Sequence, residues 1–294
     1  MLAQAFAIAI VVSIALIVAL PGVAGSLLNE PGGVWGHKNE LGRAMVFSAL
    51  VSCALLVSRR TQHRWWHPVL LFASLALIAV SRSAQAVLVA VISLSLIWPL
   101  VMFVSRRNRR LNWRVFLAVL TTLTAGALIA DVASESILAA IDRDATLTDR
   151  TLIWEVVTDL GGEQPWLGAG YGAFWTSDAA YLFRDRWSDL DHSHNGYVDL
   201  WLELGFVGLL AFAALLILAH KRAWDAGLVV QGSPARFLPA FLFTAMLLNT
   251  VGRVFPEHNN MYWTLLSYTA LLPKSVGARQ VMRMMRRPAP QSPT

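Results

Sequence analysis

Repeated apolar runs, each long enough to cross a lipid bilayer, dominate the chain. The hydrocarbon core of a bilayer is roughly 30 Å thick, so a helix needs about 20 residues to span it. The composition agrees, because 56% of the residues are hydrophobic and only 14% are charged, which is unlike a soluble domain. We therefore expect lipid to be the main solvent. The runs lie at residues 2–20, 41–58, 115–131, 200–219 and 237–251, with a shorter span or re-entrant helix at 258–272.

The apolar segment 67–104 is too long for a single crossing, because as one helix it would extend roughly 54 Å. Two spans must therefore meet inside it, near Arg82. Basic clusters flank both ends of the segment, and positively charged loops face the cytoplasm. With the first span retained and the N-terminus inside, eight spans follow. The clusters are Arg59, Arg60 and Arg64 before the segment, and Arg106, Arg107, Arg109 and Arg110 after it.

The sequence thus predicts an all-α polytopic membrane protein of about eight transmembrane helices with one long external loop. Residues 1–131 supply helices one to five and residues 200–273 supply helices six to eight, while the basic tail 274–294 is expected to be cytoplasmic and disordered. The external loop, 132–199, should contain short amphipathic helices. One of them can begin at Thr148 or Asp149, with the apolar stripe Leu152, Ile153, Val156, Val157 and Leu160, and end before Gly161 and Gly162.

Composition also excludes several kinds of site. A lone cysteine, Cys53, leaves neither a disulfide framework nor a cysteine-based metal site. The net charge of +6 arises from short clusters between apolar runs, where orientation in the membrane explains it better than a nucleic-acid partner. We therefore expect no nucleic acid.

The densest polar constellation lies at the end of the external loop. It comprises Asp189, Asp191, His192, His194 and Asn195, and the following span carries Asp199 and Glu203 near its outer end. Polar groups at that depth are costly and usually functional. The His-x-His pair could ligate a metal, but without a third histidine or a cysteine nearby the spacing is weak evidence. Alternatively, these residues only solvate a loop.

Three arginines, Arg82, Arg150 and Arg253, are predicted to lie at the outer face, where Lys38 could add a fourth cation. Guanidinium groups bind phosphate oxygens in bidentate fashion, so this set suits a polyanionic phosphate ligand at the membrane surface. In the alternative interpretation each arginine reaches lipid headgroups or pairs with a carboxylate such as Asp149 or Glu257. The tryptophans of the loop (Trp154, Trp166, Trp175 and Trp187) with Trp201 are typical of an interfacial aromatic belt.

A resemblance follows from these motifs. His194-Asn195, nine intervening residues and Gly205-Phe206-Val207-Gly208 resemble the H-N-x9-G-x-x-G pattern of bacterial O-antigen ligases, in which the glycines are expected to permit close helix packing. The same superfamily includes O-antigen and exopolysaccharide polymerases. Further similar elements are the stretch Gly36 to Gly42, Ser81-Arg82-Ser83, Arg150-x-x-x-Trp154 and Pro165-x-x-Gly168-x-Gly170. Family members usually carry several more spans ahead of the equivalent of the first span here, and ligases show a leucine where this sequence has Ala86.

The resemblance implies an inverting, metal-independent glycosyltransferase of the bacterial inner membrane, without a cofactor, whose active site faces the periplasm. It would move a glycan from undecaprenyl-pyrophosphate to a hydroxyl of another glycan or of lipid A core, among membrane lipids and with a chain-length regulator as a further partner. His194 would be the base. The pyrophosphate would be bound by Arg82, Arg150, Arg253 and Lys38, and the site supported by His37, Asn39, Asp191, His192, Asn195 and Asp199.

Within the family, ligase and polymerase share the donor and differ in the acceptor. Gly36-His37-Lys38-Asn39 is more similar to exopolysaccharide polymerases, which favours a polymerase. A transporter or flippase of lipid-linked sugars is the alternative of another class, but it predicts ionisable residues at mid-span rather than at one face. A purely structural scaffold gives no reason for external cations beside His194.

Overall fold

The computed structural model describes residues 2–19, 31–58, 64–97, 148–180, 191–229, 237–255 and 260–272. Every regular element in these ranges is helical, and none of them contains a strand, which confirms the predicted all-α class. Three helices have the length and apolar composition to cross a membrane: Leu2–Ala19, Lys38–Leu56 and Gly196–Ala226. The predicted span 115–131, the start of the external loop and the tail 274–294 lie outside the described residues.

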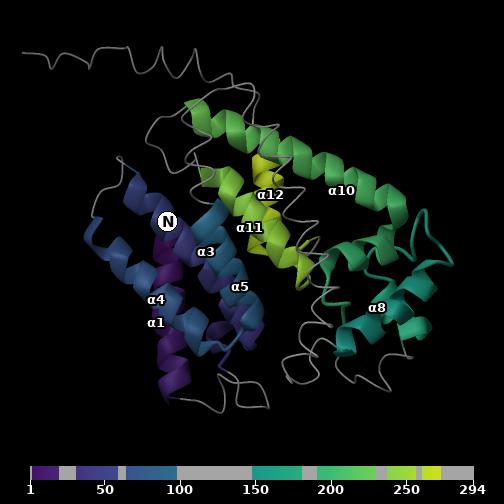
Figure 1. Ribbon diagram of the computed structural model, residues 1–294, viewed down its shortest axis with the longest axis horizontal. Coiled ribbons are helices and arrows are strands. Elements are labelled where there is room, and N and C mark those ends of the chain that lie inside the picture. Colours follow the sequence, from purple (N-terminus) through teal and green to yellow (C-terminus); the bar gives the residue numbers. More distant parts are fainter. Residues whose placement is uncertain are drawn as a thin grey trace, which may run out of the picture.

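Four N-terminal helices form one side of the molecule (Figure 1). They are α1 (Leu2–Ala19), α3 (Lys38–Val57), α4 (His67–Val80) and α5 (Ala84–Ile92), which continues as a π-helical turn, Ser93–Ile97. The helix α3 packs against the other three and is the most buried of them, whereas most of α1 is exposed. Apolar side chains on an exposed helix face are expected where lipid is the solvent.

The remaining apolar helices pack against this group in two layers. The helices α11 (Leu238–Thr250) and α12 (Met261–Leu271) lie between the N-terminal group and α10 (Gly196–Val229) (Figure 1). Aromatic contacts join the layers, since the Phe47 ring lies 5.2 Å from both Phe241 and Tyr262. α8 (Thr148–Gly161) packs beside the first part of α10 and buries Ile153 and Val157, so the helix predicted within the external loop is confirmed.

The predicted break near Arg82 is confirmed as the turn between α4 and α5. Neither glycine nor proline makes this turn. Instead the Ser81 hydroxyl donates to the Ile78 carbonyl at 2.7 Å and accepts from the Ser83 amide at 3.3 Å. The Ser83 hydroxyl then caps α5 by accepting from the Ala86 amide. Arg82 between them adopts a left-handed φ of 54°, which is uncommon for a residue with a side chain.

A break at Gly205 divides α10 into a short first part, 196–204, and a long second part, 206–229 (Figure 1). Gly205 has φ 62° and ψ −163°, a conformation essentially restricted to glycine. The loop 165–170 fills the break: the amides of Phe206 and Val207 donate to the Pro165 and Trp166 carbonyls, at 2.9 and 3.1 Å. In return the Leu202 and Glu203 carbonyls accept from the amides of residues 169 and 170. The predicted single span 200–219 is therefore wrong at its start.

Candidate active site at one end of the helices

His194 lies in a tight turn directly before α10. Its φ is 59°, and Arg82 is the other residue with a side chain that has a positive φ among those described. The side chain of Asn195 caps α10 by accepting from the Tyr197 amide at 3.0 Å and the Val198 amide at 3.4 Å. Asn195 is buried, while His194 is half-buried. The cap thus aligns the histidine with the start of α10.

Buried polar groups hold Ser193, the residue that precedes the histidine. The Asp199 carboxylate, 1% exposed, accepts from the Ser193 amide at 2.9 Å and from the Trp175 indole at 3.2 Å. The Trp154 indole of α8 donates to the Ser193 carbonyl at 2.8 Å. Asp199 Oδ1 is therefore bonded to the turn and to Trp175. The other oxygen, Oδ2, is buried without a hydrogen-bond partner among the described residues.

A second histidine stands beside His194. The ring centroids of His192 and His194 are 4.3 Å apart, and His192 Nδ1 donates to the exposed Asp191 carboxylate at 2.5 Å. This hydrogen bond lowers the pKa of Asp191 below its ordinary value. Asp189 lies outside the described residues. In the described part of the chain no three His, Cys, Asp or Glu side chains gather as they would around a metal ion.

Arg253 forms an ion pair with Glu203 of α10. Its Nη2 lies 3.1 Å from Glu203 Oε1, and the side chains are 17% and 1% exposed. This arginine therefore pairs with a carboxylate, that of Glu203; Glu257, which the sequence suggested as a partner, lies outside the described residues. Glu203 Oε2 is buried without a hydrogen-bond partner in the described ranges. One guanidinium thus faces two buried carboxylates, those of Glu203 and, one helical turn earlier, Asp199.

The start of α3 connects Arg82 to Arg253. Asn39 Oδ1 accepts from the Ser83 hydroxyl at 2.8 Å, beside Arg82. Arg43, only 6% exposed, donates to the Arg253 carbonyl at 3.2 Å and pairs with Glu40. The sequence analysis missed Arg43; the signal that could have found it is a charged residue one turn inside an apolar span.

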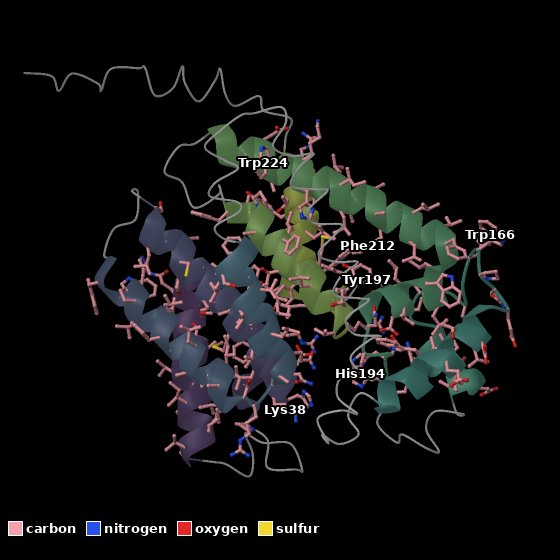
Figure 2. The ribbon with its side chains drawn as sticks, in the orientation of Figure 1. Lys38, Trp166, His194, Tyr197, Phe212 and Trp224 are labelled. Atoms are coloured by element: carbon pink, nitrogen blue, oxygen red, sulfur yellow. The ribbon has the colours of Figure 1, made fainter. Side chains whose placement is uncertain are left out.

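The predicted site residues therefore come from five segments: the start of α3, the α4–α5 turn, the first turn of α8, the start of α10 and the residues after α11. His37 caps α3 by accepting from the Asn39 amide, and the half-buried Lys38 is the first residue of that helix. Figure 2 shows Lys38 and His194 at the same end, with Trp224 at the opposite end. The exposed Arg82 joins this end through Ser83 and Asn39. Arg150 lies in the first turn of α8; its side chain is outside the described residues.

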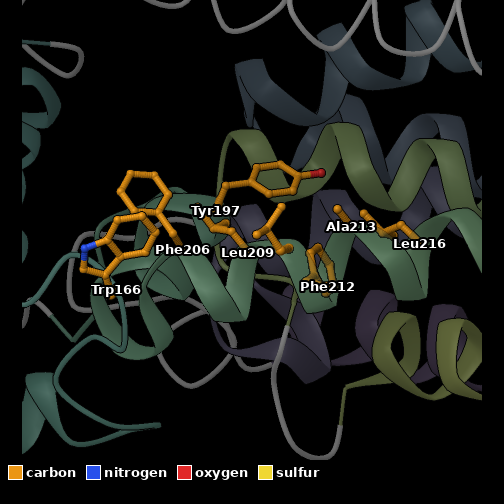
Figure 3. Close-up of a pocket in the computed structure, with 8 residues that line it drawn as sticks. Trp166, Tyr197, Phe206, Leu209, Phe212, Ala213 and Leu216 are labelled. Atoms are coloured by element: carbon orange, nitrogen blue, oxygen red, sulfur yellow. The ribbon is translucent and has the colours of Figure 1, made fainter.

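An apolar cavity of about 620 Å³ begins next to this end. Figure 3 shows its lining along α10, from Trp166 and Phe206 past Leu209 to Leu216. Tyr197, three residues after His194, forms part of the wall and donates its hydroxyl to the Met246 carbonyl at 3.2 Å. The cavity therefore connects the His194 turn with the apolar depth of the helices.

Comparison with known proteins identifies two similarities. Residues 67–213 match a family model described as O-antigen ligase, a match that includes Arg82, Arg150 and His194 but neither Lys38 nor Arg253. The chain is also 30% identical over 147 residues to the exopolysaccharide production protein ExoQ of Rhizobium meliloti (strain 1021). That similarity covers 47% of this chain and 34% of the Rhizobium protein, so the chain matches about a third of that relative's length.

Proposed function

Since residues 67–213 match its model, the chain belongs to the O-antigen ligase family, and we propose that it is an inverting glycosyltransferase that takes a glycan from undecaprenyl-pyrophosphate at the periplasmic face of the inner membrane. The observation that carries the proposal is the His194 turn: a histidine with a left-handed φ, fixed on both sides by buried hydrogen bonds. Such over-determined strain is typical of functional sites.

The cations around this turn suit the donor pyrophosphate. Arg82 is exposed and held on a rigid turn, and Lys38 lies at the same end, at the start of α3. Arg253 shares its charge with Glu203, so in our proposal it contributes less to phosphate binding than Arg82 and Arg150. Bidentate guanidinium contacts would stabilise the charge that develops on the departing pyrophosphate.

The proposed reaction is a single displacement. A hydroxyl oxygen of the acceptor attacks the anomeric carbon of the donor sugar, and the bond from that carbon to the phosphate oxygen breaks. Undecaprenyl pyrophosphate leaves with the electron pair, while the hydroxyl proton passes to the His194 imidazole as general base. Because the nucleophile enters opposite the leaving group, the configuration at the anomeric carbon inverts. Stabilised pyrophosphate can leave unprotonated, so the scheme needs no general acid.

The apolar cavity along α10 suits the polyprenyl chain of the same donor. The chain would enter beside Tyr197, close to the reacting groups, and follow the apolar lining toward Leu216. Because the chain would pass into the cavity from lipid and not from water, the gain comes from close packing against the apolar lining. We therefore propose that the cavity binds the first isoprene units.

The glycan acceptor distinguishes a polymerase from a ligase. Similarity to a protein of exopolysaccharide production and the Gly36-His37-Lys38-Asn39 element favour a polymerase, whose acceptor is another carrier-linked glycan. The family description favours a ligase, whose acceptor is lipid A core. A chain-length regulator is a further partner that we propose for the polymerase.

The direct test is transfer by the purified protein in lipid nanodiscs, from a defined polyprenyl-pyrophosphate oligosaccharide. We expect products with multiple repeat units when a second carrier-linked glycan is offered; a single addition to lipid A core would instead identify a ligase. We also expect the rate to be unchanged by EDTA, because arginines neutralise the phosphate charge in this scheme. Absence of transfer to either acceptor would contradict the proposed function. Loss of activity in EDTA that Mg²⁺ restores would contradict metal independence.

Narrowing the cavity should weaken binding of long-chain donors selectively. Ala213 lines the cavity, whereas its neighbour Ala214 is exposed outside it, so Ala213→Trp and Ala214→Trp form a matched pair. Losing the packing of about one isoprene unit against the lining should raise the KM for an undecaprenyl donor about three- to fivefold in Ala213→Trp. A donor with a single isoprene unit, which is too short to extend along the cavity to Ala213, should keep its KM, and Ala214→Trp should behave as wild type. An equal rise for both donors would show that the cavity does not hold the lipid chain.

A further inference from the structure

We infer that Trp154 and Trp175 are positioning residues whose indole N–H groups set the orientation of His194. The inference rests on the proposed function, in which His194 is the base. Neither tryptophan would touch the substrate in this role. Each acts through Ser193, the residue directly before the histidine. Trp154 connects the turn to α8, and Trp175 connects it to the short helical turn Phe174–Thr176.

The backbone conformation of His194 must be stabilised by contacts with the surrounding residues. A left-handed φ such as its 59° is uncommon for residues with a side chain and persists only where surrounding contacts enforce it. Here both peptide groups of Ser193 are constrained: its amide donates to Asp199 and its carbonyl accepts from Trp154. The Ser193 hydroxyl also donates to the Asn195 carbonyl at 2.9 Å, on the other side of His194. The imidazole therefore projects from a backbone that is fixed on both sides.

Trp154 connects the turn to α8 through its hydrogen bond to Ser193. The helix buries Ile153 and Val157 in a small apolar cluster with Leu202 of α10, and Trp154 packs against that cluster. The indole N–H is therefore presented from a rigid helix at 2.8 Å to the Ser193 carbonyl. Arg150 precedes Trp154 by one helical turn. A shift of α8 that breaks this hydrogen bond would also move the residue proposed to bind pyrophosphate.

Trp175 is connected to the turn indirectly, through the carboxylate of Asp199. It is 6% exposed, packs against Phe174 with ring centroids 5.1 Å apart, and donates to the same Asp199 oxygen that accepts from the Ser193 amide. The carboxylate is thus held between an indole and the turn. The N–H groups of these two tryptophans bond inside the protein, which the expected interfacial belt did not predict. Trp166, which is 68% exposed, differs from both.

The test replaces each indole with a ring of similar shape that lacks the N–H. For Trp154→Phe and Trp175→Phe we expect kcat for glycan transfer to fall tenfold or more, with the KM for the donor within about threefold of wild type, because a displaced base affects the transition state more than binding. Trp65→Phe, at an indole that is 76% exposed directly before α4 and outside the proposed site, is the control and should keep kcat within about twofold. Unfolding temperatures of the variants in the same detergent establish that each is folded.

A second readout does not require catalysis. Diethyl pyrocarbonate modifies exposed imidazoles, and mass spectrometry gives the modification rate of His194 separately from that of His192. We expect this rate to change at least threefold in Trp154→Phe and Trp175→Phe, and to stay unchanged in Trp65→Phe. Wild-type kcat together with a wild-type modification rate in both variants would overturn the inference. If the wild-type protein transfers no glycan but the rates still change, the proposed function fails and the positioning role remains. The two tryptophans lie in different elements, so a variant that does not fold leaves the other as the test.

Discussion

Replacement of His194 by asparagine should reduce glycan transfer by about 10² to 10⁴-fold, the usual contribution of a general base. Asparagine is the best-matched substitution, because it tolerates the left-handed φ of 59° better than most residues and so preserves the turn. Its amide cannot take the hydroxyl proton. The loss should therefore appear in kcat, with little change in the affinity for undecaprenyl pyrophosphate measured by calorimetry in nanodiscs.

The neighbouring histidine provides the control for this experiment. The His192 ring lies 4.3 Å from that of His194, but it is engaged by Asp191 through Nδ1. His192→Asn should therefore keep transfer within about tenfold of wild type. An active His194→Asn variant beside an inactive His192→Asn variant would move the role of base to His192. Full activity in both would remove the imidazoles from the mechanism.

The sequence was sufficient to predict the helices and the place of the histidine turn. Apolar runs of bilayer length predict α1, α3 and α10 because hydrophobicity is a property of local sequence. The break near Arg82 followed from length alone, since 67–104 is too long for one crossing. The serines that shape this turn act through side-chain hydrogen bonds, which periodicity does not reveal.

Tertiary partners could not be predicted in the same way. The position of Arg43 inside an apolar span indicates a buried charge, but the local sequence does not identify its partner, the carbonyl of Arg253, which lies 210 residues away in the chain. Trp154 and Trp175 matched an interfacial belt by composition, but their N–H partners lie 39 and 24 residues away in the chain. The glycines of the Gly205-x-x-Gly208 motif were expected to pack helices closely. Close packing occurs at Gly205, yet its partner is the loop 165–170, and α10 is broken there.

This break makes Gly205→Ala the substitution with the largest expected effect on the fold. A Cβ at this position would lie 2.2 Å from the Trp166 carbonyl carbon and 2.5 Å from the Leu167 amide nitrogen, both of them backbone atoms that cannot move separately. The conformation alone costs about 1–3 kcal/mol for a residue with a side chain. The loop 165–170 must then leave α10 and give up the hydrogen bonds to Phe206 and Val207. We expect an unfolding temperature at least about 5 °C lower and protease cleavage within the loop.

Gly172→Ala separates the two causes of this effect. Gly172 also has a positive φ, 68°, but no atom lies within 4 Å of the place that its Cβ would occupy. This variant therefore reports the backbone strain alone, about 1 kcal/mol, and should unfold near the wild-type temperature and transfer glycan normally. In Gly205→Ala, transfer should be lost as well, because Asp199 and Glu203 lie on the short part of α10 that the break orients beside His194. A Gly205→Ala protein with wild-type stability and activity would show that α10 functions as one continuous helix.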